Sequence, residues 1–422
     1  MRSKTVALGL GSNLNSPLEN LRHALAELKK SFKVLTVSSI YESDALLPEN
    51  ASNDWNRKFL NAVVLCEVPE SLGPEDILQE IKSIENKIGR RESERWAPRL
   101  IDIDILYWNR ENYRSEKINI PHKSLFERPF ALLPLLEVWD GWASDLPDWT
   151  ALWCEEKPFN TMKSHKYFWP KMVGILNITE DSFSDGGRFL NADSLQMQFN
   201  QLVEQGADIV DIGAESTRPG AIAPTEDEEY KKLHWALSEI KTTVPISLDC
   251  RNAGVAARVL ETHNITYLND VTGFAKPEMR KLLIQSELSA FVMHSLSVPP
   301  RGDLILDTEV NPCRQLDIWW NERLCDLIKS GIYPDRLIFD PGIGFGKNKL
   351  QSLYILRHLN ELSDVKNPVM IGHSRKSFLS LISDRPAAER DLETALVTID
   401  LNLAYVQYLR VHNIQTQVMA LK

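Results

Sequence analysis

The sequence predicts two unlike domains, the first of the α+β class and the second of the α/β class. Its 422 residues are enough for two or three domains, each with its own hydrophobic core. The first 140 residues follow the order strand, helix, strand, strand, helix, strand, which is that of a ferredoxin-like sandwich. From residue 171, eight short apolar runs alternate with helical stretches, which indicates a TIM (β/α)8 barrel. We therefore expect domains at 1–140 and 171–422, joined by a segment at 141–170.

The elements of the first domain are predicted from hydrophobic spacing. The helix at 17–30 places leucines one turn apart and has Pro17 at its first position, where proline is favoured. The helix at 74–88 repeats leucine and isoleucine at the same period. The apolar or β-rich runs that predict strands are 5–10, 32–41, 59–68 and 100–108.

The predicted strands of the second domain end on polar residues. The apolar runs cover 172–178, 208–213, 245–248, 266–268, 290–293, 337–339, 369–371 and 408–411, with helical patterns such as 195–205, 226–240, 315–329 and 350–362 between them. The polar residues at their ends are Asn177, Asp249, Asn269, His294, Asp340, Ser374 and His412. Because the carboxyl ends of barrel strands carry the chemistry, we expect an active site there.

Charge and cysteine content exclude several classes of protein. Acidic residues outnumber basic ones by 58 to 48, and both halves of the chain are acidic, so we expect neither nucleic-acid nor membrane binding. The five cysteines are scattered without CxxC spacing, which favours reduced thiols over a zinc site. No apolar run reaches the ~18–20 residues of a membrane span, and the N-terminus does not read as a secretory signal. We expect a cytoplasmic protein.

The connecting segment is rich in tryptophan. Five of the eleven tryptophans lie between 139 and 169. A flexible linker would be rich in glycine and serine instead. We therefore expect this segment to be ordered and to pack between the domains or under the barrel.

Two carboxylates of the first domain are placed to bind a divalent cation. Asp102 and Asp104 share one face of the strand at 100–108, because residues two apart on a strand point the same way. Paired carboxylates beside arginines suit Mg²⁺ and a polyphosphate, whereas a solvent-exposed polar stripe is the alternative reading. The segments 9–14 and 341–348 both depart from the glycine-rich nucleotide loops, so a nucleotide would bind without one. The arginines that precede the carboxylates are Arg90, Arg91, Arg95 and Arg99.

Six motifs of the first domain resemble those of 6-hydroxymethyl-7,8-dihydropterin pyrophosphokinases. They are LGSNL at 10–14, YES at 41–43, FLN at 59–61, RWAPRLIDID at 95–104, IPH at 120–122 and RPF at 128–130. The resemblance implies transfer of diphosphate from the co-substrate ATP to the pterin hydroxymethyl group, with release of AMP.

The same resemblance implies roles for individual residues of the first domain. Two Mg²⁺ ions would be held by Asp102 and Asp104. The pterin would contact Ser43, Leu46, Phe59, Asn61 and Phe130. ATP would be bound by Lys82, Glu85, Trp96, Arg99, His122 and Arg128. Arg91 and Arg95 would join Arg99 in catalysis, on a loop with Trp96 that closes over the site.

Three predicted strand ends of the second domain carry groups that suit a pterin ring. Asp249, Asn269 and Asp340 would all face one mouth of the barrel. A carboxylate accepts from a pair of N–H donors, and an amide meets an edge that mixes donors and acceptors. Polar, glycine-containing loops are predicted at 177–187 and 215–220. They either form part of the site or only connect a strand to the next helix.

The second domain resembles dihydropteroate synthases from about residue 171 onward. The matching motifs are GILNIT at 174–179, DSFSDGG at 181–187, ESTRPG at 215–220, SLD at 247–249, NDV at 269–271, MH at 293–294, DPGIGFG at 340–346, SRK at 374–376 and RVH at 410–412. The resemblance implies that a pterin diphosphate condenses with p-aminobenzoate to give dihydropteroate and diphosphate.

This second resemblance also implies residue roles. The pterin would contact Asp249, Asn269, Asp340 and Lys376. Thr217, Arg218 and Asp185 would close over p-aminobenzoate, whose carboxylate would meet Ser374. Arg410 and His412 would hold the diphosphate, and Asn177 would bind one Mg²⁺. Lys376, Asp185 and Arg218 are the residues expected to be catalytic, and His373 is expected to tune the p-aminobenzoate end of the pocket.

The two resemblances support each other, because the product of the first reaction is the substrate of the second. We therefore expect a bifunctional enzyme of folate synthesis that acts on small molecules, with a homodimer through the barrel left open. One alternative is a catalytically silent scaffold that binds pterin or nucleotide. The other is an unrelated nucleotide kinase fused to an aldolase-type barrel.

Overall fold

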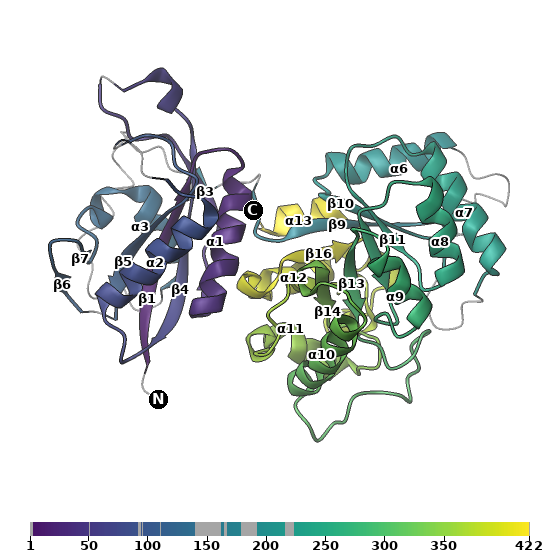
Figure 1. Ribbon diagram of the computed structural model, residues 1–422. Coiled ribbons are helices and arrows are strands. Elements are labelled where there is room, and N and C mark those ends of the chain that lie inside the picture. Colours follow the sequence, from purple (N-terminus) through teal and green to yellow (C-terminus); the bar gives the residue numbers. More distant parts are fainter. Residues whose placement is uncertain are drawn as a thin grey trace. The chain divides into compact units, whose positions relative to one another are not determined.

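The computed structural model describes residues 3–49, 51–91, 94, 96–109, 111–139, 162–163, 167–178, 192–215 and 223–421. The chain divides into two compact units, Met1–Trp169 and Pro170–Leu421 (Figure 1). Within the described ranges, every helix is too short or too polar to cross a membrane.

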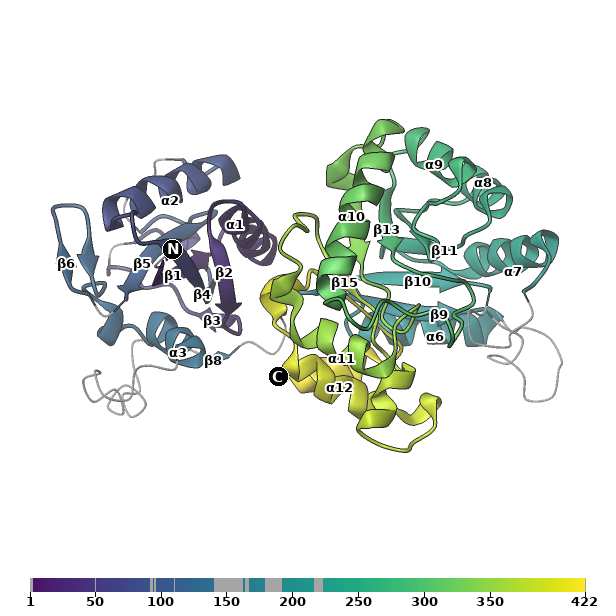
Figure 2. The same cartoon turned by 90° about the horizontal axis from the view of Figure 1, so that it is seen from below.

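The first unit is a six-stranded antiparallel sheet with helices on both faces. The strand order is β5-β1-β4-β3-β8, and β2 also pairs with β4. Helices α1 and α2 cover one face of the sheet and α3 covers the other (Figure 2). This confirms the predicted α+β sandwich. The elements are β1 (Ser3–Ser12), α1 (Pro17–Ser31), β2 (Lys33–Val37), β3 (Tyr41–Ser43), β4 (Phe59–Pro69), α2 (Pro74–Ile88), β5 (Asp102–Trp108), the small pair β6 (Tyr113–Arg114) and β7 (Asn119–Ile120), α3 (Pro129–Val138) and β8 (Met162–Lys163).

The strand expected at 32–41 is divided into β2 and β3, and Ser38 lies at the break. The Ser38 hydroxyl accepts a hydrogen bond from the Val63 backbone N–H at 2.9 Å, while the Ser38 N–H donates to the Val63 carbonyl at 2.9 Å. A side-chain oxygen thus replaces a backbone carbonyl in the ladder, which interrupts regular pairing.

The end of the connecting segment belongs to the first unit. β8 pairs with β3, and the buried Trp169 donates its indole N–H to the Ser38 carbonyl at 2.7 Å. Trp139, at the end of α3, packs edge-on against Tyr107. These contacts all lie within the first unit. The sequence had led us to expect contacts under the barrel or between the domains. Trp142, Trp149 and Trp153 lie outside the described residues.

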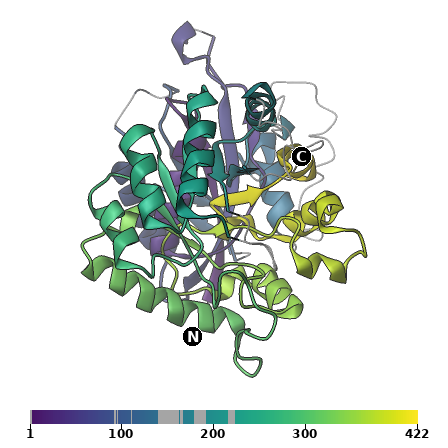
Figure 3. The same ribbon diagram turned by 90° about the vertical axis from the view of Figure 1, so that its right-hand side faces the viewer.

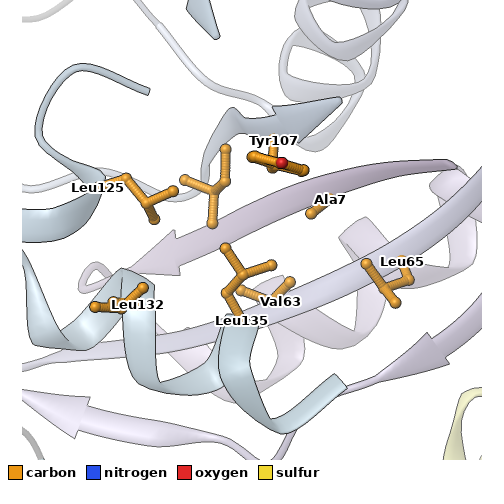
Figure 4. Close-up of a cluster of buried hydrophobic side chains, with 8 residues drawn as sticks. Ala7, Val63, Leu65, Tyr107, Leu125, Leu132 and Leu135 are labelled. Atoms are coloured by element: carbon orange, nitrogen blue, oxygen red, sulfur yellow. The ribbon is translucent and has the colours of Figure 1, made fainter. Parts of the chain in front are cut away.

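A hydrophobic core under α3 holds three adjacent strands of this sheet together, β5, β1 and β4. Its buried members come from β1, β4, β5, α3 and the short 3-10 helix Leu125–Glu127 before α3, and Figure 4 shows their side chains meeting between helix and strands. They are Ala7, Val63, Leu65, Leu106, Tyr107, Leu125, Leu132 and Leu135. Because this core holds β1, β4 and β5 together, it also fixes the register of the polar residues farther along the same strands.

The second unit is a closed barrel of eight parallel strands, as predicted. The order is β14-β13-β12-β11-β10-β9-β16-β15, and a parallel bridge between Phe339 and Val369 joins the two ends. The strands are β9 (Lys171–Asn177), β10 (Ile209–Gly213), β11 (Ile246–Asp249), β12 (Tyr267–Asp270), β13 (Ser289–Met293), β14 (Leu337–Asp340), β15 (Met370–Ile371) and β16 (Tyr408–Val411).

Helices surround these strands (Figures 2 and 3). They are α6 (Ala192–Glu204), α7 (Glu226–Glu239), α8 (Ala253–Thr262), α9 (Pro277–Ile284), α10 (Pro312–Lys329), α11 (Lys349–Arg357), α12 (Asp391–Asp400) and α13 (Ile414–Leu421). The helix expected at 350–362 stops at Arg357, because His358 leaves the helical region with φ −122° and ψ 38°. The SRK motif is followed by a short 3-10 helix, Ser377–Leu381.

The barrel interior is apolar at one level and polar at the next. The apolar layer is Val173, Ile209, Phe291, Ile338 and Met370, with Tyr267 and Tyr408 packed against it. Residues two positions farther along a strand face the same side. Asp211, Asn269, Asp340 and Arg410 therefore follow the apolar layer toward the carboxyl ends of the strands. This alternation places a buried polar cluster directly above a hydrophobic floor.

Candidate active sites

The first unit contains a cavity of about 380 Å³ at one end of its sheet. It unites twelve of the residues that the sequence analysis selected from motifs far apart in the chain. They are Ser43, Leu46, Phe59, Asn61, Lys82, Trp96, Arg99, Asp102, Asp104, His122, Arg128 and Phe130. A site large enough for a small molecule therefore forms where the motifs predicted one.

Strand register explains how the cavity forms. Gly11 of β1 lies between Asn61 of β4 and Asp102 of β5, and Gly9 lies opposite Asp104. Both glycines line the cavity, and they leave room that side chains would take from it. A Cβ atom on Gly9, for example, would come within 2.9 Å of Leu106.

One part of the cavity suits a flat aromatic ring. Phe59 and Phe130 line it, and Asn61 donates a hydrogen bond from Nδ2 to the Ser43 hydroxyl at 2.9 Å. This bond holds the Asn61 side chain in place beside the two rings. Two aromatic side chains with a fixed amide can both stack on a ring and hydrogen-bond its edge.

The other part of the cavity concentrates charge. Arg90 and Arg99 each contact one oxygen of Asp102 at 2.7 Å. Burial opposes ionisation of Asp102, but the two arginines outweigh it and lower the pKa of this carboxyl. For Asp104, burial and then repulsion from Asp102 raise the pKa to about 6.

The donor set fits a divalent cation that is shared with a ligand. Both carboxylates line the cavity, and no described residue donates a hydrogen bond to Asp104. Within the described ranges, no group of three or more His, Cys, Asp or Glu side chains could hold a metal by itself. A hard cation here would therefore take part of its oxygen shell from phosphate or water, which is the usual mode of Mg²⁺.

Two of the described residues proposed from sequence, Glu85 and Arg91, do not line this cavity. Glu85 is buried and accepts hydrogen bonds from Lys82, Arg90 and the Ile103 backbone N–H. Arg91 is exposed, whereas Arg90, one of the four arginines that precede the carboxylates, reaches the cavity although the resemblance implied no individual role for it. Arg95 lies outside the described residues.

In the barrel, the polar layer forms one hydrogen-bonded network. Arg410 donates from Nε to Asp211 at 2.6 Å and from Nη2 to Asp249 at 2.7 Å. Asn269 donates from Nδ2 to the same Asp211 oxygen at 3.0 Å. Burial, and then repulsion from Asp211, raise the pKa of Asp249. The network brings Asp249, Asn269 and Arg410 together as expected and adds Asp211, which sequence reasoning missed.

Lys376 and Asp340 lie beside this network. Asp340 accepts a hydrogen bond from the Gly342 backbone N–H at 2.7 Å, and burial raises its pKa. The Lys376 ammonium lies 4.3 Å from the centre of the Phe345 ring, and burial and then Arg410 lower its pKa to about 8. Asp340, Lys376 and Arg410 also interact electrostatically.

Gly342 makes the turn after β14 possible. Its φ of +64° is rare for other residues, and an added Cβ would lie 1.9 Å from the His294 carbonyl oxygen. Only glycine therefore lets the chain pass this close to the end of β13.

Ser374 and His412 form a pair at the ends of β15 and β16. The His412 backbone N–H donates to the Ser374 hydroxyl at 3.2 Å, and His412 Nδ1 lies 3.0 Å from the same oxygen. Burial, Arg375 and Arg410 lower the pKa of His412 to about 3, so its ring is neutral at physiological pH.

The prediction that His373 tunes the p-aminobenzoate end of the pocket gains no support from its contacts. Its fully buried ring turns toward α12, where Nε2 lies 2.9 Å from the Thr398 hydroxyl and 3.1 Å from the Thr394 carbonyl. Of the other predicted barrel residues, Asn177 is the last residue of β9 and is partly exposed. Asp185, Thr217 and Arg218 lie outside the described residues.

Two family models match the chain. The family described as 7,8-dihydro-6-hydroxymethylpterin-pyrophosphokinase matches residues 7–140, and the family described as pterin binding enzyme matches residues 173–412. The folate synthesis bifunctional protein of Chlamydia trachomatis is 34% identical over 97% of this chain and 95% of its own length. The chain belongs to this bifunctional folate synthesis family.

Other relatives agree with this membership. The mitochondrial folate synthesis bifunctional protein of Pisum sativum is 31% identical over 100% of this chain and 89% of its own length. The crystal structure of dihydropteroate synthase from Anaplasma phagocytophilum, with bound 6-hydroxymethylpterin-monophosphate, is 33% identical with a TM-score of 0.54 and covers 60% of this chain and 97% of that one. This folate synthesis enzyme therefore has pyrophosphokinase and dihydropteroate synthase activities. The alternative of an unrelated kinase fused to an aldolase-type barrel is excluded.

Proposed function

We propose that the cavity of the first unit transfers the diphosphate of ATP to 6-hydroxymethyl-7,8-dihydropterin and releases AMP. The supporting observation is that a single cavity joins an aromatic pair to a cluster of carboxylates and arginines. Phe59 and Phe130 stack on the pterin, and Asn61, Ser43 and Leu46 contact its edge. The hydroxymethyl group then points toward the charged part of the cavity.

The charged residues hold the nucleotide. Lys82, His122 and Arg128 bind ATP with Trp96, and the buried Glu85 holds Lys82 and Arg90 in place by hydrogen bonds. Arg99 and Arg90 stabilise the negative charge of the moving diphosphate, joined by Arg95 and Arg91 when their loop closes. Asp102 and Asp104 hold two Mg²⁺ ions, which supply neutralisation of phosphate charge when bound.

The barrel joins the resulting pterin diphosphate to p-aminobenzoate. Asp249, Asn269, Asp340 and Lys376 hold the pterin above the apolar floor. The amine of p-aminobenzoate attacks the methylene carbon as diphosphate leaves, so positioning and stabilisation of the leaving group are the tasks of the protein.

The diphosphate is received by Arg410 and His412, beside one Mg²⁺ held by Asn177. Arg410 uses Nε and Nη2 for Asp211 and Asp249, which leaves Nη1 for the diphosphate. His412 acts as a neutral hydrogen-bonding group, since its pKa is low. Ser374, Thr217, Arg218 and Asp185 bind p-aminobenzoate.

A second copy of this chain covers one face of α12. Leu392, Leu396 and Ile399 lie along one side of this helix and are 49–60% exposed. Leu396→Lys should convert a dimer into a monomer in light scattering, whereas Met197→Lys on α6 should not. A wild-type protein that is already monomeric would refute this homodimer.

The proposed compartment is a reducing one such as the cytoplasm. The described cysteines, Cys66, Cys250, Cys313 and Cys325, are all free thiols. The pea relative carries the name mitochondrial, so localisation by fluorescence microscopy is the deciding measurement.

Product analysis tests the two-step reaction directly. The purified chain is supplied with ATP, Mg²⁺ and hydroxymethyl-dihydropterin, and the products are identified by mass spectrometry. We expect AMP and pterin diphosphate without p-aminobenzoate, and dihydropteroate when it is added. Release of ADP in place of AMP would refute diphosphate transfer.

A further inference from the structure

We propose that Asp211 is a positioning residue for the pterin, because it holds the Asn269 amide so that the amide oxygen is presented to the substrate as a hydrogen-bond acceptor. This inference rests on the proposed function, in which Asn269 binds the pterin.

The orientation of the Asn269 amide follows from the chemistry of its partner. Asp211 is 1% exposed, and its Oδ2 atom lies 3.0 Å from the Asn269 amide and 2.6 Å from Arg410 Nε. Arg410 is always a donor, so it keeps this oxygen in the role of acceptor. The Asn269 atom that faces Asp211 must then be the NH2 group, whichever way the amide is drawn.

The other end of the amide lacks a partner. Asn269 Oδ1 is buried and accepts no hydrogen bond from any residue in the described part of the chain. A buried acceptor without a donor is costly and uncommon in folded proteins. An N–H group of the pterin ring supplies the missing donor, since the pterin is the ligand proposed for this layer.

Asp211 thereby determines which ring edge is recognised. The Asp249 carboxylate, tied to the same network through Arg410, is a second acceptor. Two neighbouring acceptors select a ring edge that offers N–H donors and disfavour one that offers ring-nitrogen lone pairs. Without Asp211, the Asn269 amide could turn over and present its NH2 group, and this selection would be lost.

The first test is Asp211→Asn, which keeps the shape of the side chain but provides both a donor and an acceptor. We expect the KM for pterin diphosphate to rise about tenfold, as for a buried hydrogen bond left unmade. The KM for p-aminobenzoate, measured at saturating pterin diphosphate, should stay within about twofold. A Kd for 6-hydroxymethylpterin, measured by calorimetry, should rise in parallel.

The matched control is Asp270→Asn. Asp270 directly follows Asn269 on β12, so its side chain points to the opposite face of the strand. Asp270 is also fully buried, but its carboxylate accepts from Thr272 and from the Phe274 backbone N–H. This variant should lower the melting temperature without changing the pterin KM. The proposal would be overturned if the pterin KM of the Asp211→Asn variant equalled that of the wild type. It would also be overturned if Asp211→Asn and Asp270→Asn changed the pterin KM equally.

A double variant separates positioning from a purely structural role. In Asp211→Asn with Asn269→Asp, residue 269 offers only acceptors to the ligand, whichever partner it finds. We expect this exchange to recover most of the pterin affinity that the single variant loses. Failure to recover it, with a melting temperature equal to that of the single variant, would overturn the proposal.

Asn269→Ala distinguishes the two levels of inference. If it leaves the pterin KM unchanged, the pterin site proposed for the barrel is wrong. If it raises that KM while Asp211→Asn does not, the site stands and only the role of Asp211 is refuted.

Discussion

Replacement of Asp104 by asparagine should stabilise the first unit while it abolishes the first reaction. Asp104 lies in the cavity beside Asp102, and no described residue donates a hydrogen bond to it. Its ionised form is therefore costly in the protein without ligands. The same carboxylate is proposed to hold Mg²⁺. Removal of its negative charge should therefore raise the stability of the unit and abolish its activity.

The size of the stability gain follows from the pKa of Asp104. A rise from the usual 3.8 to about 6 costs about 3 kcal/mol, at about 1.4 kcal/mol for each tenfold change in proton affinity. Because the carboxylate borders a cavity, solvent screening should reduce this to about 1–2 kcal/mol. Since the folded state holds the proton more tightly, the cost is absent below pH 4, grows up to pH 6 and is complete above it.

Calorimetry and a product assay test both halves of this prediction. At pH 8, the transition that shifts on addition of an ATP analogue should rise by about 2–6 °C in the variant, and the rise should vanish near pH 4. AMP release should fall by orders of magnitude. Dihydropteroate formation from supplied pterin diphosphate should remain normal. Near-normal AMP release would refute the metal assignment, and a rise that does not depend on pH would refute the electrostatic reasoning.

Three further substitutions test other parts of the molecule. Lys376→Ala should abolish dihydropteroate formation and leave AMP release intact, because the ammonium beside Asp340 belongs to the barrel site; loss of both would contradict separate sites. Gly342→Ala should destabilise the barrel by more than about 3 kcal/mol in thermal unfolding, since its Cβ would collide with the His294 carbonyl. Trp169→Phe should cost the first unit about 1 kcal/mol by removing the hydrogen bond to Ser38, and an unchanged transition in calorimetry would count against that bond.

The features that local pattern predicted well are those with local causes. Alternation on β5 was sufficient to place Asp102 and Asp104 on one face, and both line the cavity. Apolar spacing predicted the starts of α1 at Pro17 and α2 at Pro74, and for α1 proline at the first helical position added to it. The repeated strand and helix pattern predicted the eight-stranded barrel.

The features that were missed depend on tertiary partners. Asp211 interrupts an apolar strand, and this isolated charge was the available signal for a buried polar role. Only the structure brings Arg410 and Asn269 to it. His373 stands beside the SRK motif in sequence, but its ring points to α12, where Thr398 is its partner. Arg90 reaches the cavity because Glu85 and Asp102 hold it there.

The pairing of β8 with β3 matters to anyone who wishes to express the two catalytic halves as separate proteins. A fragment ending at residue 140 would lack β8 and Trp169. It would expose the outer edge of β3, and open edges invite strand pairing between copies and precipitation. A fragment that continues through Trp169 keeps both, and its counterpart can begin at Pro170, one residue before β9. The coding sequence is therefore best divided after codon 169.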